Sequence, residues 1–219
     1  MSRNELSTGA KICSRMAGAF FLTLLTLALL AGSGCGQKTK VENNRYTALG
    51  QIMARKLSEL GGNKGTIVLV VAERDNGQTT AFGQTIDVFR GTLDKRVQII
   101  ATESVPTPAL AMRGIEPLRA EKFAELLQKY SGADYLVSFV GVPILTPAQI
   151  ERLPSPRPQV VAVVVNNTPS RDLFARKVIC LAALPKLAED LAAGAGSLQE
   201  QFNAQYQMVT AETAGALLH

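Results

Sequence analysis

The sequence predicts an α/β domain built on a mostly parallel sheet of about five strands with helices on both faces. This is a three-layer arrangement of the Rossmann-like or flavodoxin-like kind. Two observations support it. Four short runs of β-branched and aliphatic residues alternate with segments of helical periodicity. The first run, TIVLVVA at 66–72, is β-branched and apolar on both faces, which is typical of a strand covered on both sides.

The first 34 residues have the pattern of a secretory signal peptide. Arg3, Lys11 and Arg15 precede an uncharged apolar run over residues 17–31, and small residues follow it. The run has about 15 residues, whereas a helix that spans a bilayer needs about 20. The segment is therefore predicted to direct export and to be removed.

The residues Leu30 to Cys35, LAGSGC, resemble the lipobox of bacterial lipoproteins, in which a cysteine is lipidated and becomes the new N-terminus. Ser33 and Gly34 match the usual small residues, but Gly32 stands where an aliphatic residue is common. Ordinary cleavage near Ser33 and an uncleaved anchor therefore remain open. The resemblance implies a palmitate-type lipid on Cys35 and a membrane facing the periplasm. Because Gly36 rather than aspartate follows, it favours the outer membrane.

Composition excludes several classes of function. His219, the last residue, is the one histidine, so triads, Cys–His pairs and histidine-ligated zinc sites lack an imidazole. No metal or cofactor is expected, and an enzyme is the less favoured interpretation. Without residues 1–34, 20 of the 23 Lys and Arg and 17 of the 18 Asp and Glu remain, a net charge of +3. These charges are scattered, so a nucleic-acid partner is not expected.

The exported part begins with a short polar tether, residues 35–43. A helix follows to Leu60, where Gly61 and Gly62 are expected to end it. The next elements are predicted in this order: a strand at 66–72, a helix from about 80 to 93, a strand at 97–105, a helix at 118–130, a strand at 134–142, a short helix from Thr146 to near Leu153, and strands at 160–165 and 177–184.

The last strand is ambiguous in direction. Only about a dozen residues join it to the preceding strand, which is near the minimum for a parallel crossover, so an antiparallel edge strand is possible. The α/β domain is predicted over residues 44–185. Residues 186–219 are predicted as a C-terminal helical segment packed on the domain, with a capping box at Ser197 and Glu200 and a short extended stretch near 206–210.

Ligands of open parallel sheets bind beyond the carboxyl ends of the strands. At the ends of strands one, two and four, this rule selects a set of candidate ligand-binding residues: Arg74, Asp75, Thr79, Thr80, Glu103, Asn166 and Asn167. In the alternative interpretation, the threonines cap a helix, the charged residues are solvated and the asparagines form a turn. Glu73 and Glu103 form a weaker candidate acid–base pair. Failing these, an apolar face near Phe202 and Tyr206 is the next candidate.

The segments TIVLVVA, TTAFGQTIDVFRGTL, VQIIATE and ADYLVSFVGVP, within residues 65–143, are similar to one lobe of type 1 periplasmic binding proteins. The similarity is one of pattern, so it transfers no binding residues. Proteins of that family close two lobes around a ligand, and this chain is long enough for one lobe.

Three functional hypotheses follow. The leading one is a lipid-anchored binding or protein-interaction module without catalysis, whose partner is a protein or a small ligand. The second is a single-lobe solute-binding component, alone or paired with a second lobe or a second copy. The third is a carboxylate-based extracytoplasmic enzyme using Glu73, Asp75 and Glu103.

Overall fold

The computed structural model describes residues 36–76, 80–106, 118–163, 169–186 and 196–218. The chain divides into two compact units, residues 1–42 and 43–219. In the first unit the described residues are 36–42, which begin helix α2 (Gly36–Leu60). The fold described below is that of the second unit.

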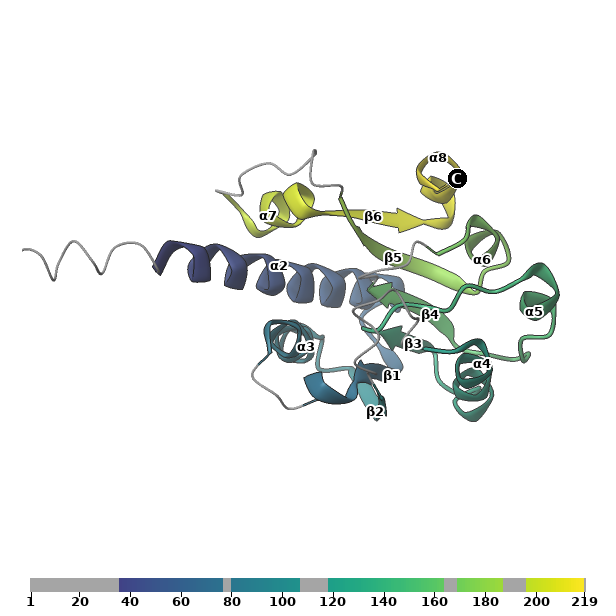
Figure 1. The fold of residues 1–219 in the computed structure, drawn as a ribbon. Helices are drawn as coiled ribbons and strands as arrows, with labels where there is room; N and C mark the ends of the chain where they lie inside the picture. The colour runs from purple at the N-terminus through teal and green to yellow at the C-terminus, as the bar shows by residue number, and fades with distance from the viewer. Residues whose placement is uncertain (1–35, 77–79, 107–117, 164–168, 187–195, 219) are drawn as a thin grey trace, which may run out of the picture. The chain divides into compact units, whose positions relative to one another are not determined.

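A six-stranded sheet forms the centre of the second unit, in the order β2-β1-β3-β4-β5-β6 (Figure 1). The strands are β1 (Gly65–Ala72), β2 (Val97–Val105), β3 (Tyr135–Ser138), β4 (Gln159–Val163), β5 (Ile179–Pro185) and β6 (Tyr206–Thr210). The first five are parallel to their neighbours, and β6 runs antiparallel to β5. The predicted fold class is confirmed.

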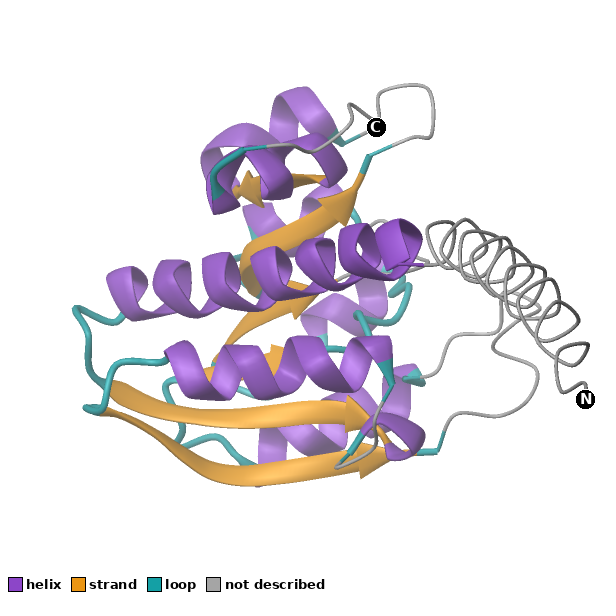
Figure 2. Ribbon diagram, turned by 90° about the vertical axis from the view of Figure 1, so that its left-hand side faces the viewer, coloured by secondary structure: helices purple, strands orange, loops and turns teal. Residues whose placement is uncertain are grey.

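Helices cover both faces of this sheet (Figure 2). One face carries α2, α3 (Ala81–Thr92) and α7 (Leu198–Gln205), whose residues Leu49, Phe89 and Phe202 belong to one hydrophobic cluster. The other face carries four helices that share a second cluster: α4 (Ala120–Lys129), α5 (Pro147–Glu151), α6 (Arg171–Ala175) and α8 (Ala211–Leu217). A short 3-10 helix, η1 (Glu73–Asp75), follows β1.

Burial of both faces explains the apolar runs in the sequence. Along β1, Ile67 and Leu69 face the α2–α3 cluster, whereas Val70 belongs to the cluster under α4. Alternate residues of a strand point to opposite faces, so a strand covered on both sides must be apolar throughout. Two predicted capping boxes, at Thr146 of α5 and Ser197 of α7, are also present.

The structure corrects one expectation about the chain's organisation, decides a second that was open, and confirms and extends a third. The segment predicted as a tether, residues 35–43, is helical from Gly36 onward, where α2 begins. The ambiguous fifth strand, β5, is parallel to β4. Residues 206–210 form a sixth strand, β6, paired with β5 from Pro185 to Leu181. A pairing of this kind depends on a tertiary neighbour, which local sequence does not reveal.

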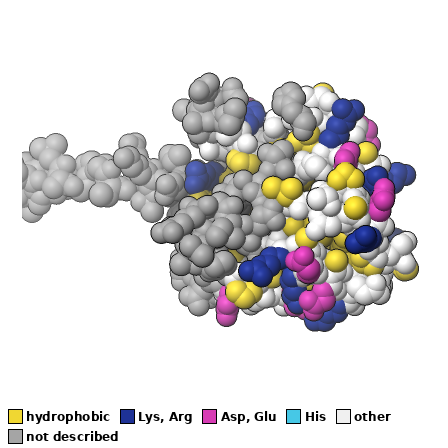
Figure 3. Space-filling model, turned by 45° about the vertical axis from the view of Figure 1, so that its right-hand side comes forward, with side chains coloured by type: hydrophobic (Ala, Val, Ile, Leu, Met, Phe, Trp, Pro, Cys, Tyr) yellow, Lys and Arg dark blue, Asp and Glu magenta, His cyan; other side chains and the backbone are white. Residues whose placement is uncertain are grey.

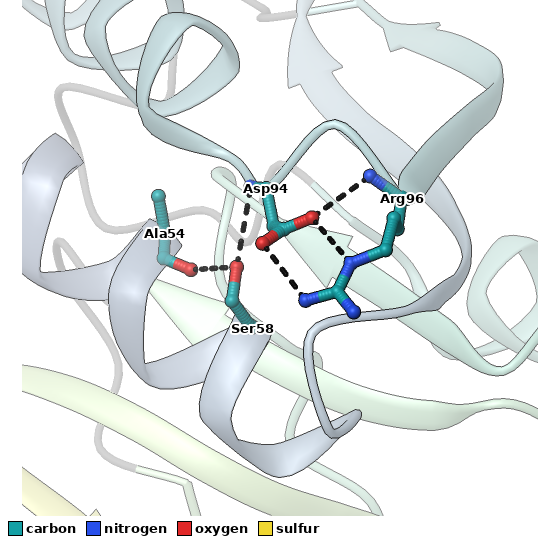
Figure 4. A network of polar contacts seen from close by, with 4 residues as sticks. All are labelled: Ala54, Ser58, Asp94 and Arg96. Atoms are coloured by element: carbon teal, nitrogen blue, oxygen red, sulfur yellow. Dashed lines mark hydrogen bonds and ion pairs between the residues drawn. The ribbon is translucent and has the colours of Figure 1, made fainter.

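Polar contacts tie the end of α2 to the turn between α3 and β2 (Figure 4). The Ser58 hydroxyl donates to the Ala54 carbonyl at 2.9 Å and accepts the Asp94 backbone N–H at 3.5 Å. The Asp94 carboxylate accepts from the Arg96 backbone N–H at 2.9 Å and from its Nε at 3.1 Å. These contacts fix the turn that leads into β2.

Among the described residues, no helix is both long and apolar enough to cross a bilayer. The apolar run at 17–31 lies outside them. On the face of the molecule in Figure 3, basic and acidic side chains are interspersed.

Candidate functional site

The strand order defines one place where the connections diverge. From β1 the chain passes to β2 on one side, and from β2 it returns to β3 on the other side of β1. The carboxyl ends of β1 and β3 therefore flank a topological switch point, where open α/β sheets bind ligands. We refer to this place as the switch-point edge.

The chain that leaves β1 brings a carboxylate to the N-terminus of α3. Asp75, in η1, is 5% exposed, and its Oδ1 accepts a hydrogen bond from the Thr80 hydroxyl at 2.8 Å. Thr80 is the N-cap of α3, because its hydroxyl also accepts the Gly83 backbone N–H at 2.8 Å. A negative charge is favourable beside the N-terminus of a helix. Asp75 and Thr80 thus form one connected group.

The chain that leaves β3 turns sharply. The Phe139 backbone N–H still donates to the Val70 carbonyl at 2.8 Å, which keeps Phe139 beside β1. The buried Ser138 hydroxyl donates to the Gly141 carbonyl and closes the turn. Gly141 has a φ of 80°, a conformation that a side chain disfavours. This turn fixes the Phe139 ring at the switch-point edge.

Aromatic rings extend from Phe139 across the helices above it. The Phe139 ring lies 5.2 Å from the Phe89 ring and 6.3 Å from the Phe82 ring, and the Phe82 ring lies 6.5 Å from that of Tyr46. All three pairs are edge-to-face, the favourable arrangement for aromatic rings. Phe139 is buried, whereas Phe82 and Tyr46 are half-buried. We call Tyr46, Phe82 and Phe139 the aromatic rim.

A cation lies at the end of this rim. The Arg45 guanidinium lies 4.5 Å from the centre of the Tyr46 ring and donates to the Tyr46 hydroxyl. Burial raises the pKa of Tyr206, at the start of β6, and the nearby charge of Arg45 acts against that rise. Because α2 runs antiparallel to the strands, its Arg45 end lies at their carboxyl ends, beside the aromatic rim.

The predicted site residues separate into three groups. Asp75 and Thr80 are brought together at the switch-point edge. Glu103 is directed elsewhere, since its carboxylate accepts from Lys129 at 2.6 Å and from the Tyr130 hydroxyl. These two hydrogen bonds lower the Glu103 pKa, so the carboxylate is charged and paired rather than poised as an acid beside Glu73. The Arg74 side chain and all of Thr79, Asn166, Asn167 and Cys35 lie outside the described residues.

The sequence interpretation placed the site at the ends of strands one, two and four. The strand order places the topological switch point between strands one and three. Two aromatic residues in the sequence could have indicated the switch-point edge. Phe82 lies in the first turn of the helix after β1, and Phe139 directly follows β3. Phe202 and Tyr206 were the alternative candidate face. Phe202 is 1% exposed and lies in the core, and Tyr206 lies near Arg45.

The described part of the site offers aromatic faces and a few polar groups. No group of three or more metal-ligating side chains occurs in the part of the chain that is described. Burial raises the pKa of the half-buried Cys180 thiol to about 11, which keeps it protonated and unreactive at neutral pH.

No protein-family model matches the sequence, and no curated protein matches it. The fold is similar to that of several solved sugar-binding proteins. An arabinose-binding protein from Geobacillus stearothermophilus superimposes with a TM-score of 0.51 at 13% identity, over 80% of this chain. A solute-binding protein of an ABC transporter from Agrobacterium vitis, bound to α-D-tagatopyranose, gives 0.51 at 15% identity over 79% of this chain. One from Burkholderia graminis, in complex with D-arabinose, gives 0.50 at 14% identity over 79%.

At the level of the fold, these similarities confirm the resemblance of residues 65–143 to a lobe of periplasmic binding proteins. The chain spans less than two thirds of the length of each, namely 64%, 60% and 62%.

Proposed function

We propose that this chain is a non-catalytic binding protein of the cell envelope, and that its folded unit binds a small polar solute at the switch-point edge. The observation that supports the proposal most directly is the aromatic rim beside the Asp75–Thr80 group at the strand ends. Small-molecule sites combine apolar or aromatic walls with a few placed polar groups.

A monosaccharide is the solute class that fits this combination. Half-buried aromatic rings such as Phe82 and Tyr46 suit the apolar face of a sugar ring, and carboxylate or hydroxyl groups such as those of Asp75 and Thr80 suit its hydroxyls. The fold similarity to arabinose- and tagatose-binding proteins supports this class. A lobe of this size encloses less of a ligand than two lobes do, so we expect weaker binding than in a two-lobed protein.

Attachment of the protein through lipid at Cys35 is the second part of the proposal. It is supported by the order of the regions in residues 1–35, where basic residues are followed by an apolar run and then by small residues before Cys35. The anchor would hold the binding unit at the membrane that faces the periplasm, with the outer membrane favoured by Gly36.

The solute proposal is tested by thermal unfolding of the protein in the presence of arabinose, tagatose and other pentoses and hexoses. At a concentration of 100 Kd, a ligand of the native state stabilises by about 2.7 kcal/mol. For a domain of this size, that energy raises the melting temperature by about 5–11 °C. The absence of a shift with every sugar would contradict the sugar assignment.

Two variants locate the site by calorimetry. Phe82→Ala and Asp75→Asn should each weaken binding about tenfold or more, because one removes an aromatic wall and the other a carboxyl acceptor. Lys122→Ala is the matched control, since Lys122 pairs with Glu125 on α4, on the opposite face of the sheet. Binding that survives both rim variants unchanged would place the site elsewhere.

A further inference from the structure

The folded unit begins at the switch-point edge. The Tyr46 ring, on α2, lies 6.5 Å from the Phe82 ring at the start of α3. Arg45, one residue earlier, lies near Tyr206 at the start of β6. Figure 2 shows α2 antiparallel to the strands, with its start on the side to which the strand arrows point. The chain segment that leads back to Cys35 therefore leaves the folded unit at the edge where the solute site is proposed.

Few residues separate this edge from Cys35, the proposed site of lipid attachment. The folded unit starts at residue 43, eight positions after Cys35. Residues 36–42 are helical, as the first part of α2. At the helical rise, eight residues span about 12 Å, and a fully extended chain of this length reaches at most about 28 Å. A lipid on Cys35 therefore holds the switch-point edge close to the bilayer surface.

The opposite edge of the sheet is farther from the lipid than this spacer can compensate. Leu60 lies 15 positions after Arg45 on α2, which corresponds to about 22 Å at the helical rise. Leu60 is 47% exposed, and the exposed Lys64 and Lys95 precede β1 and β2 at the same edge. The helical spacer is shorter than the distance between the two edges. Turning the opposite edge to the membrane would therefore pull the lipid out of the bilayer.

The side chains of the switch-point edge suit a layer of lipid headgroups. Tyr46 and Phe82 are half-buried, so each ring is partly accessible. The Arg45 guanidinium lies over the Tyr46 ring. Amphipathic side chains such as Tyr and Arg are favoured at membrane interfaces, where an apolar body and a polar tip are both accommodated. The edge can therefore lie beside headgroups without burying an unpaired charge in hydrocarbon.

We infer that the switch-point edge faces the membrane that holds the Cys35 lipid, so that the solute site opens toward the lipid headgroups. The inference rests on the proposed lipidation of Cys35 and names the surface that the site meets. The opposite edge, with Leu60, Lys64 and Lys95, faces away from the membrane.

The inference is tested by energy transfer from a single tryptophan to dansyl-labelled lipid headgroups. The chain contains no tryptophan, so an introduced one is the only indole donor. Asn76→Trp places the donor at an exposed position that follows η1, at the switch-point edge. Leu60→Trp, the matched control, places it at the opposite edge. The full lipid-bearing protein is extracted from membranes in detergent and reconstituted on vesicles of phosphatidylethanolamine and phosphatidylglycerol.

Transfer should be about threefold or more greater from position 76 than from position 60, because transfer falls steeply with distance and the two edges are about 22 Å apart. Ser104→Trp, near the end of β2, and Lys95→Trp, before that strand, repeat the comparison at two other exposed positions. Circular dichroism shows whether each variant is folded, and mass spectrometry shows whether Cys35 carries lipid.

Three results would overturn the inference. Equal transfer from the two edges in lipid-bearing protein would refute the orientation but leave the anchor in place, and the edge would then be open to a protein partner. Greater transfer from Leu60→Trp and Lys95→Trp would mean that the opposite edge faces the membrane. Protein without lipid on Cys35 would refute both the orientation and the proposed anchor.

Discussion

Gly50 is the residue whose substitution tests the packing of α2 on α3 most directly. A Cβ added at Gly50 would lie 2.5 Å from the Thr85 carbonyl oxygen and 3.1 Å from the Phe89 backbone nitrogen. Both contacts are to backbone, so no side-chain rotation relieves them. Gly50→Ala therefore forces the two helices apart by several tenths of an ångström.

Two opposing effects set the magnitude. Alanine in a helix interior is favoured over glycine by about 1 kcal/mol. Overpacking of a dense interior costs about 1–3 kcal/mol. Because the contacts are with backbone, we expect a cost in the upper half of that range and a net loss of about 1–2 kcal/mol. For a domain of this size, the melting temperature falls by about 2–8 °C.

Gly91→Ala is the matched control on α3. A Cβ at Gly91 meets no atom within 4 Å, so only the helix preference acts, and stability should rise by about 0.4–1 kcal/mol. Urea unfolding followed by circular dichroism compares the two variants with the wild type. An increase in stability for Gly50→Ala equal to that for Gly91→Ala would refute the close approach of α2 and α3.

Three other predictions concern single residues. Cys35→Ser should leave an unprocessed precursor without fatty-acid label, and normal processing of this variant would contradict lipidation. Hydrogen bonds from Lys129 and Tyr130 lower the pKa of Glu103 in the folded protein below its pKa in the unfolded chain. The ionised Glu103 therefore stabilises the folded protein at pH values above the unfolded pKa, and this stabilisation is lost as pH falls through the folded pKa. Wild type should therefore lose more stability between about pH 6 and pH 3 than Glu103→Gln does, and equal losses in urea titrations would count against the pairing. Reductant should not change the unfolding midpoint, because Cys180 is a free thiol; a large decrease would mean that it forms a disulfide.

The sequence by itself determined the fold class, because local patterns report local burial. The unbroken apolar run at 66–72 required a strand covered on both faces, and β1 is such a strand. The capping boxes at Thr146 and Ser197 marked helix starts correctly, since a cap involves residues only three positions apart. Thr80 likewise was named as a possible cap of the helix that it begins.

Only the tertiary structure decided which strand ends lie together. The order β2-β1-β3 sets the switch point between β1 and β3, and strand order depends on pairings between residues far apart in the chain. The same holds for β6, which is a strand because β5 offers it an edge. Glu103 was expected at a ligand site, yet it pairs with Lys129, 26 positions later. Tyr46 and Phe82 belong to helical patterns of apolar residues, and such a pattern by itself indicates a buried helix face. Only the assembled fold shows them half-buried, at the end where the carboxyl termini of β1 and β3 meet.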